Sequence, residues 1–134
     1  MLHDFMNVIT LAVLGYIDYV NYKIPNVILC GWLVTTMVML KDLTPIKLST
    51  ILVSLLVTGS YIPLRHIVKC NAGDFKLYGV LTVSKGLNDA LWIILITQVF
   101  SVFPWASGIK KIQMASVTFF GYIAFLLLKI GGCL

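Results

Sequence analysis

Two aspartates are the residues best suited to chemistry, because the chain carries few acids and both lie where apolar runs meet polar segments. The sequence has five aspartates and no glutamate; Asp18 follows the first apolar run, and Asp74 precedes the fourth. Two carboxylates held a few ångströms apart do not both ionise easily and tend to share one proton. The ionised member can take a proton from water while the protonated member polarises a carbonyl, which is the chemistry of aspartic proteases.

The neighbours of these aspartates suit a site that cleaves peptides. Gly73 lacks a Cβ, so an extended substrate backbone could come close to the adjacent carboxylate. Pro25 suits the first turn of the second helix, and Asn26 could satisfy exposed backbone groups there. Lys76 could hold backbone or substrate carbonyls, or face lipid headgroups. The chemistry needs no metal and no cofactor, and we expect neither.

The composition indicates that lipid is the solvent of the elements that position these residues. Of the 134 residues, 60% are hydrophobic and only 11% are charged. A soluble domain is about 45–50% apolar and about 25% charged, and a chain this short has too much surface for its volume to hide the excess. We therefore predict an all-α, polytopic membrane helix bundle that forms a single membrane-embedded domain over residues 1–134.

Runs without charge predict about six transmembrane helices, with five as the alternative count. A spanning helix needs about 20 apolar residues, and most of the runs reach that length with their flanks. The fourth run is shorter, so it either continues past its end or forms a half-helix buried among the others. The six runs cover residues 5–17, 24–40, 48–64, 77–84, 90–109 and 112–128.

The distribution of lysine and arginine predicts the orientation, because these residues are enriched in cytoplasmic loops. If all six runs cross, the first, third and fifth loops hold Lys23, Arg65, Lys69, Lys76, Lys110 and Lys111. The opposite side holds Lys41, Lys47, Lys85 and Lys129. This bias predicts a multi-pass protein of the cytoplasmic membrane with both termini outside. Both candidate carboxylates then lie at the cytoplasmic face.

The two polar segments resemble the motifs of the type IV prepilin peptidase family, which are membrane aspartyl proteases with a G-x-G-D motif. In that family an aspartate follows the first helix and an Ile-Pro-Asn sequence comes a few residues later, as do Asp18 and residues 24–26 here. The second motif of the family is Gly-x-Gly-Asp-x-Lys-Leu. Residues 72–77 match it, whereas Asn71 stands at the first glycine. The resemblance covers the whole chain in the number and order of its helices.

The resemblance implies an endopeptidase in the cytoplasmic (inner) membrane of a prokaryote that serves type IV pilus assembly or protein secretion. Such an enzyme removes the short basic leader from prepilin-like proteins, while the apolar N-terminal helix of the substrate stays in the bilayer. By residue, Asp18 and Asp74 would form the catalytic pair, and Gly73 would be the position of close approach.

Two departures from the family refine this expectation. Asparagine tolerates left-handed backbone conformations better than most residues, so we expect activity to survive the change at Asn71. The chain also lacks the cysteine-bearing N-terminal segment of the larger bifunctional members, which predicts a minimal form with peptidase activity only.

Other interpretations of the same residues remain open. Without their motifs, both aspartates would be helix-flanking charges that set the topology, and this structural role is our prediction for Asp4, Asp42 and Asp89. One alternative function is a non-catalytic membrane assembly protein derived from such a peptidase. Another is a small transporter whose aspartates relay protons. We do not expect nucleic-acid binding, because the basic residues are scattered rather than clustered.

Overall fold

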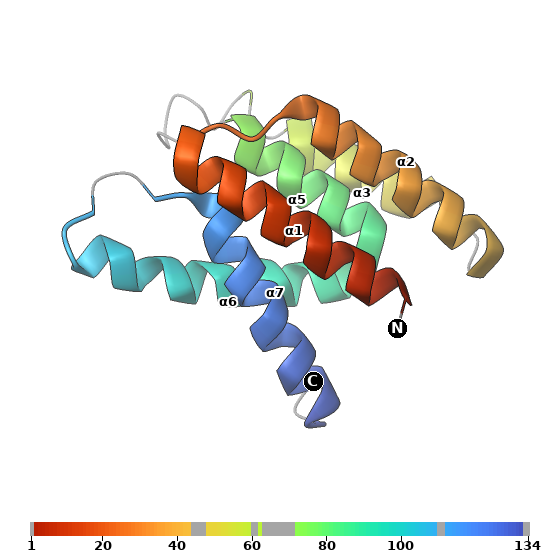
Figure 1. The fold of residues 1–134 in the computed structure, drawn as a ribbon. Coiled ribbons are helices and arrows are strands. Elements are labelled where there is room, and N and C mark those ends of the chain that lie inside the picture. Colours follow the sequence, from red (N-terminus) through yellow and green to blue (C-terminus); the bar gives the residue numbers. More distant parts are fainter. Residues whose placement is uncertain (1, 44–47, 60–61, 63–71, 110–111, 133–134) are drawn as a thin grey trace. The chain divides into compact units, whose positions relative to one another are not determined.

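Every regular element that the structure describes is a helix. The computed structural model describes residues 2–43, 48–59, 62, 72–109 and 112–132. These residues form six helices and no strand, which confirms the all-α fold class (Figure 1). In chain order the helices are α1 (Leu2–Asn21), α2 (Asn26–Leu43), α3 (Leu48–Gly59), α5 (Ala72–Lys85), α6 (Leu87–Ala106) and α7 (Met114–Ile130).

The helices group into two compact units. The first unit comprises Met1–Lys23 and Leu91–Leu134, and therefore holds α1, α7 and most of α6. The second unit comprises Ile24–Ala90 and holds α2, α3 and α5. Each unit has its own packed interior. The single membrane domain over the whole chain stays a prediction.

In the first unit, α1 packs one face against α7. The buried residues of α1 recur mostly at spacings of three and four, which place side chains on the same side of a helix. They are Asn7, Leu11, Leu14, Gly15 and Asp18. Gly15 allows a close approach of the two helices, since a Cβ at this position would lie 3.2 Å from the Ser116 Cα of α7. The Ser116 hydroxyl also donates a hydrogen bond of 2.7 Å to the Gly15 carbonyl oxygen.

The helices α6 and α7 meet where Gly121 lies against Thr97. A Cβ built on Gly121 would lie 3.1 Å from the Thr97 Cα and 3.2 Å from its backbone nitrogen. Because these are backbone atoms, a side-chain rotation at Thr97 cannot relieve the contact. Small residues at such crossings let helix backbones approach closely, as is common between transmembrane helices.

In the second unit, α5 packs against both α2 and α3 (Figure 1). Most of α5 is buried, and Leu77 and Leu81 are entirely so. Gly79 allows α3 to come close, because a Cβ there would lie 3.3 Å from the Ser54 carbonyl oxygen and would overlap the Thr58 hydroxyl. The Ser54 hydroxyl donates a hydrogen bond of 2.7 Å to the Gly79 carbonyl oxygen. The contact therefore combines small-residue packing with a hydrogen bond between helices.

The helices extend beyond the charge-free runs at the two positions of most interest. The helix α1 continues through Asp18 to Asn21, and α5 begins at Ala72, before Asp74. Each aspartate thus occupies a terminal turn of a helix, close to the predicted junction between an apolar run and a polar segment. Charged residues ended the predicted helices, but a helix end accommodates a carboxylate that gains hydrogen bonds or a favourable helix dipole.

One described helix is long and apolar enough to cross a membrane by itself, namely Leu87–Ala106. Only 17% of its apolar window is buried within the chain. Shorter apolar helices occur at Asn26–Met39, Ser49–Gly59 and Met114–Ile130. The all-helical architecture is thus established for the described residues, whereas a membrane bundle of about six spans stays a prediction.

The helix crossing at Gly121 yields a stability prediction. Gly121→Ala should lower the free energy of unfolding by about 1–3 kcal/mol, because the added methyl group meets backbone atoms that cannot move independently. Thermal denaturation in detergent, followed by tryptophan fluorescence, measures the change. Gly31→Ala is the matched control, since no atom lies within 4 Å of a Cβ built there. An equal loss of stability in both variants would contradict close packing at Gly121.

Candidate active site

Burial separates two aspartates from the others. Side chains are described for four of the five aspartates, and among these only Asp18 and Asp74 are buried, with 5% and 8% of their surface exposed. Asp4 and Asp89 are half-buried. A carboxylate loses much of its hydration when it is buried, so it must gain hydrogen bonds or opposite charge to remain ionised. The two residues selected by the motifs are therefore also those in the most demanding surroundings.

Asp18 gains such a hydrogen bond from α7. The Ala115 backbone N–H donates to the Asp18 Oδ2 over 3.1 Å, although 97 residues separate the two in sequence. Ala115 lies in the first turn of α7, where backbone N–H groups have no partner within their own helix. The residue that precedes the helix, Gln113, makes no side-chain capping hydrogen bond. Asp18 therefore acts as the N-terminal cap of α7 from another helix, and the positive end of the α7 dipole stabilises its negative charge.

The end of α1 just beyond Asp18 has an unusual backbone conformation. Tyr22 has a φ of 53°, and its N–H donates a hydrogen bond of 2.8 Å to the Asp18 carbonyl oxygen. A left-handed residue commonly ends a helix, but that residue is usually glycine. A bulky side chain in this conformation costs about 1–2 kcal/mol. The local sequence thus sets a sharp end to α1, four residues after the candidate carboxylate.

Asp74 lies in the first turn of α5, where the dipole of its own helix favours a negative charge. The residue before it, Gly73, packs against Ile24. A Cβ on Gly73 would lie 3.2 Å from the Ile24 Cβ. We expected substrate backbone to approach at Gly73, whereas here the side chain of Ile24 makes the close approach. The Ile-Pro-Asn segment and the Gly-Asp segment therefore meet within the second unit.

Lys76 and Asn26, both predicted to support the site, contact one another. The Lys76 Nζ donates a hydrogen bond of 3.1 Å to the Asn26 Oδ1. Lys76 lies two residues beyond Asp74, a rotation of about 200° around a helix, so the two side chains leave α5 on opposite sides. Pro25 stands immediately before α2, and its carbonyl oxygen accepts a hydrogen bond of 3.3 Å from the Leu29 N–H. It thus occupies the cap position, one residue earlier than predicted.

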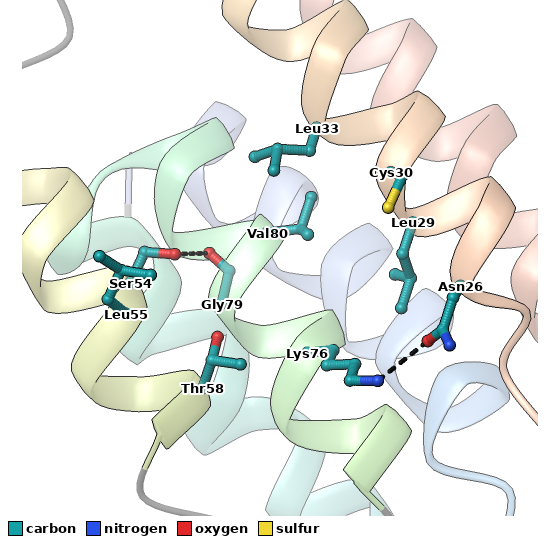
Figure 2. A pocket seen from close by; sticks show the side chains of 10 residues that line it. All are labelled: Asn26, Leu29, Cys30, Leu33, Ser54, Leu55, Thr58, Lys76, Gly79 and Val80. Carbon is teal, nitrogen blue, oxygen red and sulfur yellow. Dashed lines mark hydrogen bonds between the residues drawn. The ribbon is translucent and has the colours of Figure 1, made fainter.

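A groove of about 450 Å³ opens between α2, α3 and α5 (Figure 2). Three leucines and a valine supply apolar walls, and the hydrogen-bonded pair of Asn26 and Lys76 lies at one end. Its lining residues are Asn26, Leu29, Cys30, Leu33, Ser54, Leu55, Thr58, Lys76, Gly79 and Val80. Asp74 is not among them. The groove is therefore a second feature of this unit, beside the carboxylate.

The predicted site residues divide between the two units. Asp18 belongs to the first unit, whereas Asp74, Gly73, Lys76 and the Pro25–Asn26 segment belong to the second. Within the second unit, Gly73 lies against the Ile-Pro-Asn segment and Lys76 contacts Asn26. The meeting of the two carboxylates stays a prediction. Asn71 lies outside the described residues.

Sequence reasoning missed the residues that stabilise the site from a distance. The partners of Asp18 and Gly15 are Ala115 and Ser116, at the start of α7. A second buried network joins Asn7 to the Tyr122 hydroxyl, which donates to the Asp4 carboxylate; both hydrogen bonds measure 3.3 Å. The only sequence feature that could have indicated these partners is the absence of a capping residue before α7.

Where the chain is described, no group of three or more His, Cys, Asp or Glu residues could hold a metal ion.

Comparison with known proteins identifies no relative of this chain. No protein-family model, curated protein or solved structure matches the chain. The family resemblance therefore depends on the two motifs.

The cap on α7 yields a prediction about Asp18. Asp18→Ala should weaken the start of α7 by about 0.5–2 kcal/mol, which corresponds to a 2- to 30-fold faster amide hydrogen exchange across residues 113–118. Asp18→Asn should keep most of the protection, because its amide oxygen can still accept the Ala115 N–H. Hydrogen exchange followed by mass spectrometry measures both variants. Equal exchange in Asp18→Ala and the unaltered protein would show that this hydrogen bond does not hold α7.

Proposed function

We propose that this chain is an intramembrane aspartyl endopeptidase of the type IV prepilin peptidase kind, which removes the N-terminal leader from prepilin-like proteins at the cytoplasmic face of a prokaryotic inner membrane. The observation that carries the proposal is the selective burial of Asp18 and Asp74 among the described aspartates. Each lies in a terminal turn of a helix and within a motif that resembles the family. Buried ionisable residues in a protein of this composition are candidates for function by default.

The membrane assignment is supported by apolar side chains that remain exposed. Along α6, more than half of the surface of Leu91, Leu95, Val99 and Phe103 is exposed. Soluble monomers rarely expose contiguous apolar patches larger than a few hundred Å². Lipid contact satisfies these surfaces, and it accounts for a chain in which only 11% of residues are charged. We propose a multi-pass bundle of about six helices, whose partners are the bilayer and the apolar helix of the substrate.

The chemistry requires that the two carboxylates meet. The proposed site lies at the boundary between the membrane and the cytoplasm, where a hydrophilic leader can reach the carboxylates while the substrate helix stays in lipid.

In the proposed reaction the two carboxylates act as a single acid–base unit. The ionised carboxylate takes a proton from water as the water oxygen bonds to the scissile carbonyl carbon. The protonated carboxyl group donates its proton to the carbonyl oxygen. The C–N bond of the tetrahedral intermediate then breaks. The leaving amine takes a proton from one carboxyl group, and a hydroxyl of the intermediate returns a proton to the other carboxylate, so the carboxylic acid product forms and the pair again holds one proton. The hydrogen bond from Ala115 and the positive end of α7 stabilise negative charge on Asp18.

The test measures leader removal with conservative variants. Asp18→Asn and Asp74→Asn should each slow cleavage by at least about 10²–10⁴-fold, because each removes one partner of the acid–base pair. The assay uses purified protein in proteoliposomes and a prepilin-like substrate with a basic leader. Asp89→Asn is the matched control, since this half-buried aspartate lies outside both motifs. Full cleavage by either single variant at position 18 or 74 would contradict the two-carboxylate mechanism.

One observation favours a second function, a non-catalytic membrane assembly protein derived from such a peptidase. The hydrogen bond from Ala115 gives Asp18 a structural role that requires no chemistry. This alternative predicts that the unaltered protein does not cleave the substrate, and that assembly proceeds when both aspartates are replaced by asparagine. Peptidase activity in proteoliposomes would exclude it.

A further inference from the structure

The groove between α2, α3 and α5 combines an apolar interior with one cationic end. Leu29, Leu33, Leu55 and Val80 supply its apolar walls. Among the described residues that line it, Lys76 is the one charged side chain, and Figure 2 shows it beside Asn26 at one end of the groove. From Asn26 to Leu33 the groove follows α2 for about 10 Å, since a helix rises 1.5 Å per residue.

The polar end of the groove suits an anionic group. An ammonium group has three hydrogen-bond donors, and Asn26 accepts from one of those of Lys76 over 3.1 Å. This hydrogen bond orients the Lys76 ammonium group at the mouth of the groove. The helices α2 and α5 both begin at this end, so the positive ends of two helix dipoles lie near the lysine. The carboxylate of Asp74 leaves α5 on the opposite side, about 200° away around the helix.

One of the other polar groups in the groove is already hydrogen-bonded within the protein. The Ser54 hydroxyl already donates to the Gly79 carbonyl oxygen over 2.7 Å. Gly79 lines the groove and adds no side chain to it. The groove thus matches an amphiphile with one anionic end and an extended apolar part.

We propose that this groove binds an anionic glycerophospholipid, with the phosphate at Lys76 and one acyl chain along Leu29, Leu33, Leu55 and Val80. The proposal rests on the membrane assignment made above, because a lipid reaches the groove only from a bilayer. Exposed apolar side chains on two of the helices that form the groove support this access. Val34 of α2 and Leu52, Leu55 and Leu56 of α3 are all more than half exposed. Basic pockets between transmembrane helices on the cytoplasmic side commonly bind anionic headgroups.

The test compares lipids that differ only in headgroup charge. Protein in nanodiscs of equimolar dioleoylphosphatidylglycerol and dioleoylphosphatidylcholine is released into the gas phase, and native mass spectrometry counts the retained lipids. The unaltered protein should retain the anionic lipid about fivefold more than the zwitterionic one, the preference expected for one lysine near an anionic headgroup. Lys76→Gln should reduce this ratio to about one. Lys85→Gln is the matched control, because Lys85 lies at the other end of α5 and does not line the groove.

A second variant tests the apolar part of the groove. Cys30→Trp places a large side chain among the lining residues at an exposed position. It should reduce the retention of both lipids while leaving their ratio unchanged. A ratio that survives Lys76→Gln, or that falls equally with Lys85→Gln, would overturn the proposal.

Failure of the lipid-binding proposal can be distinguished from failure of the peptidase proposal. Protein that enters nanodiscs and shows no preference for the anionic lipid would refute the lipid site alone. Protein that does not enter a bilayer would refute the membrane assignment and the lipid site together. Loss of leader cleavage in Asp18→Asn has no bearing on the lipid ratio, because Asp18 belongs to the other unit.

Discussion

A carboxylate that leaves water needs compensating hydrogen bonds or favourable dipoles, and this constraint explains where the two buried aspartates lie. Asp18 is at the unfavourable, C-terminal end of its own helix, yet it accepts the first-turn N–H of Ala115 in α7. Asp74 is at the favourable, N-terminal end of its own helix. Both positions stabilise negative charge inside an apolar chain. The packing of α1 on α7 follows from the same constraint, because Gly15 must let the helices approach for Asp18 to reach Ala115.

Asp18 has two separable roles, one as the cap of α7 and the other as a proposed member of the catalytic pair. The hydrogen bond from Ala115 gives Asp18 a structural role in addition to the proposed catalytic one. The asparagine variant separates the two roles, since it retains a capping oxygen and removes the charge. In the second unit, Lys76 is directed toward Asn26 and away from Asp74. Lys76 therefore lies on a different side of α5 from the proposed catalytic carboxylate, where it can contact another ligand.

Much of the fold could be predicted from the sequence, because apolar runs between charges mark helices in a chain with so few charged residues. The ends of α1 and α5 could not be predicted in this way, since each helix continues through an aspartate stabilised at its end. Local motifs select Asp18 and Asp74, which are the two buried aspartates among those that the structure describes. The hydrogen bonds of Asp18 with Ala115 and of Lys76 with Asn26 span 97 and 50 residues. No local pattern specifies such contacts, which depend on how the helices pack.

The central claim is that Asp18 and Asp74 meet in the folded membrane protein, and a cross-linking measurement tests it most directly. The doubly substituted protein carries Asp18→Cys and Asp74→Cys, with its three native cysteines replaced by serine. In membranes, mild oxidation or a short bifunctional thiol reagent should join the two positions, since a disulfide needs Cα atoms within about 7 Å. Rapid, nearly complete intramolecular cross-linking is the predicted result. If protein that is folded and inserted in the bilayer forms no such cross-link, the carboxylates do not form a pair and the proposed peptidase mechanism is wrong.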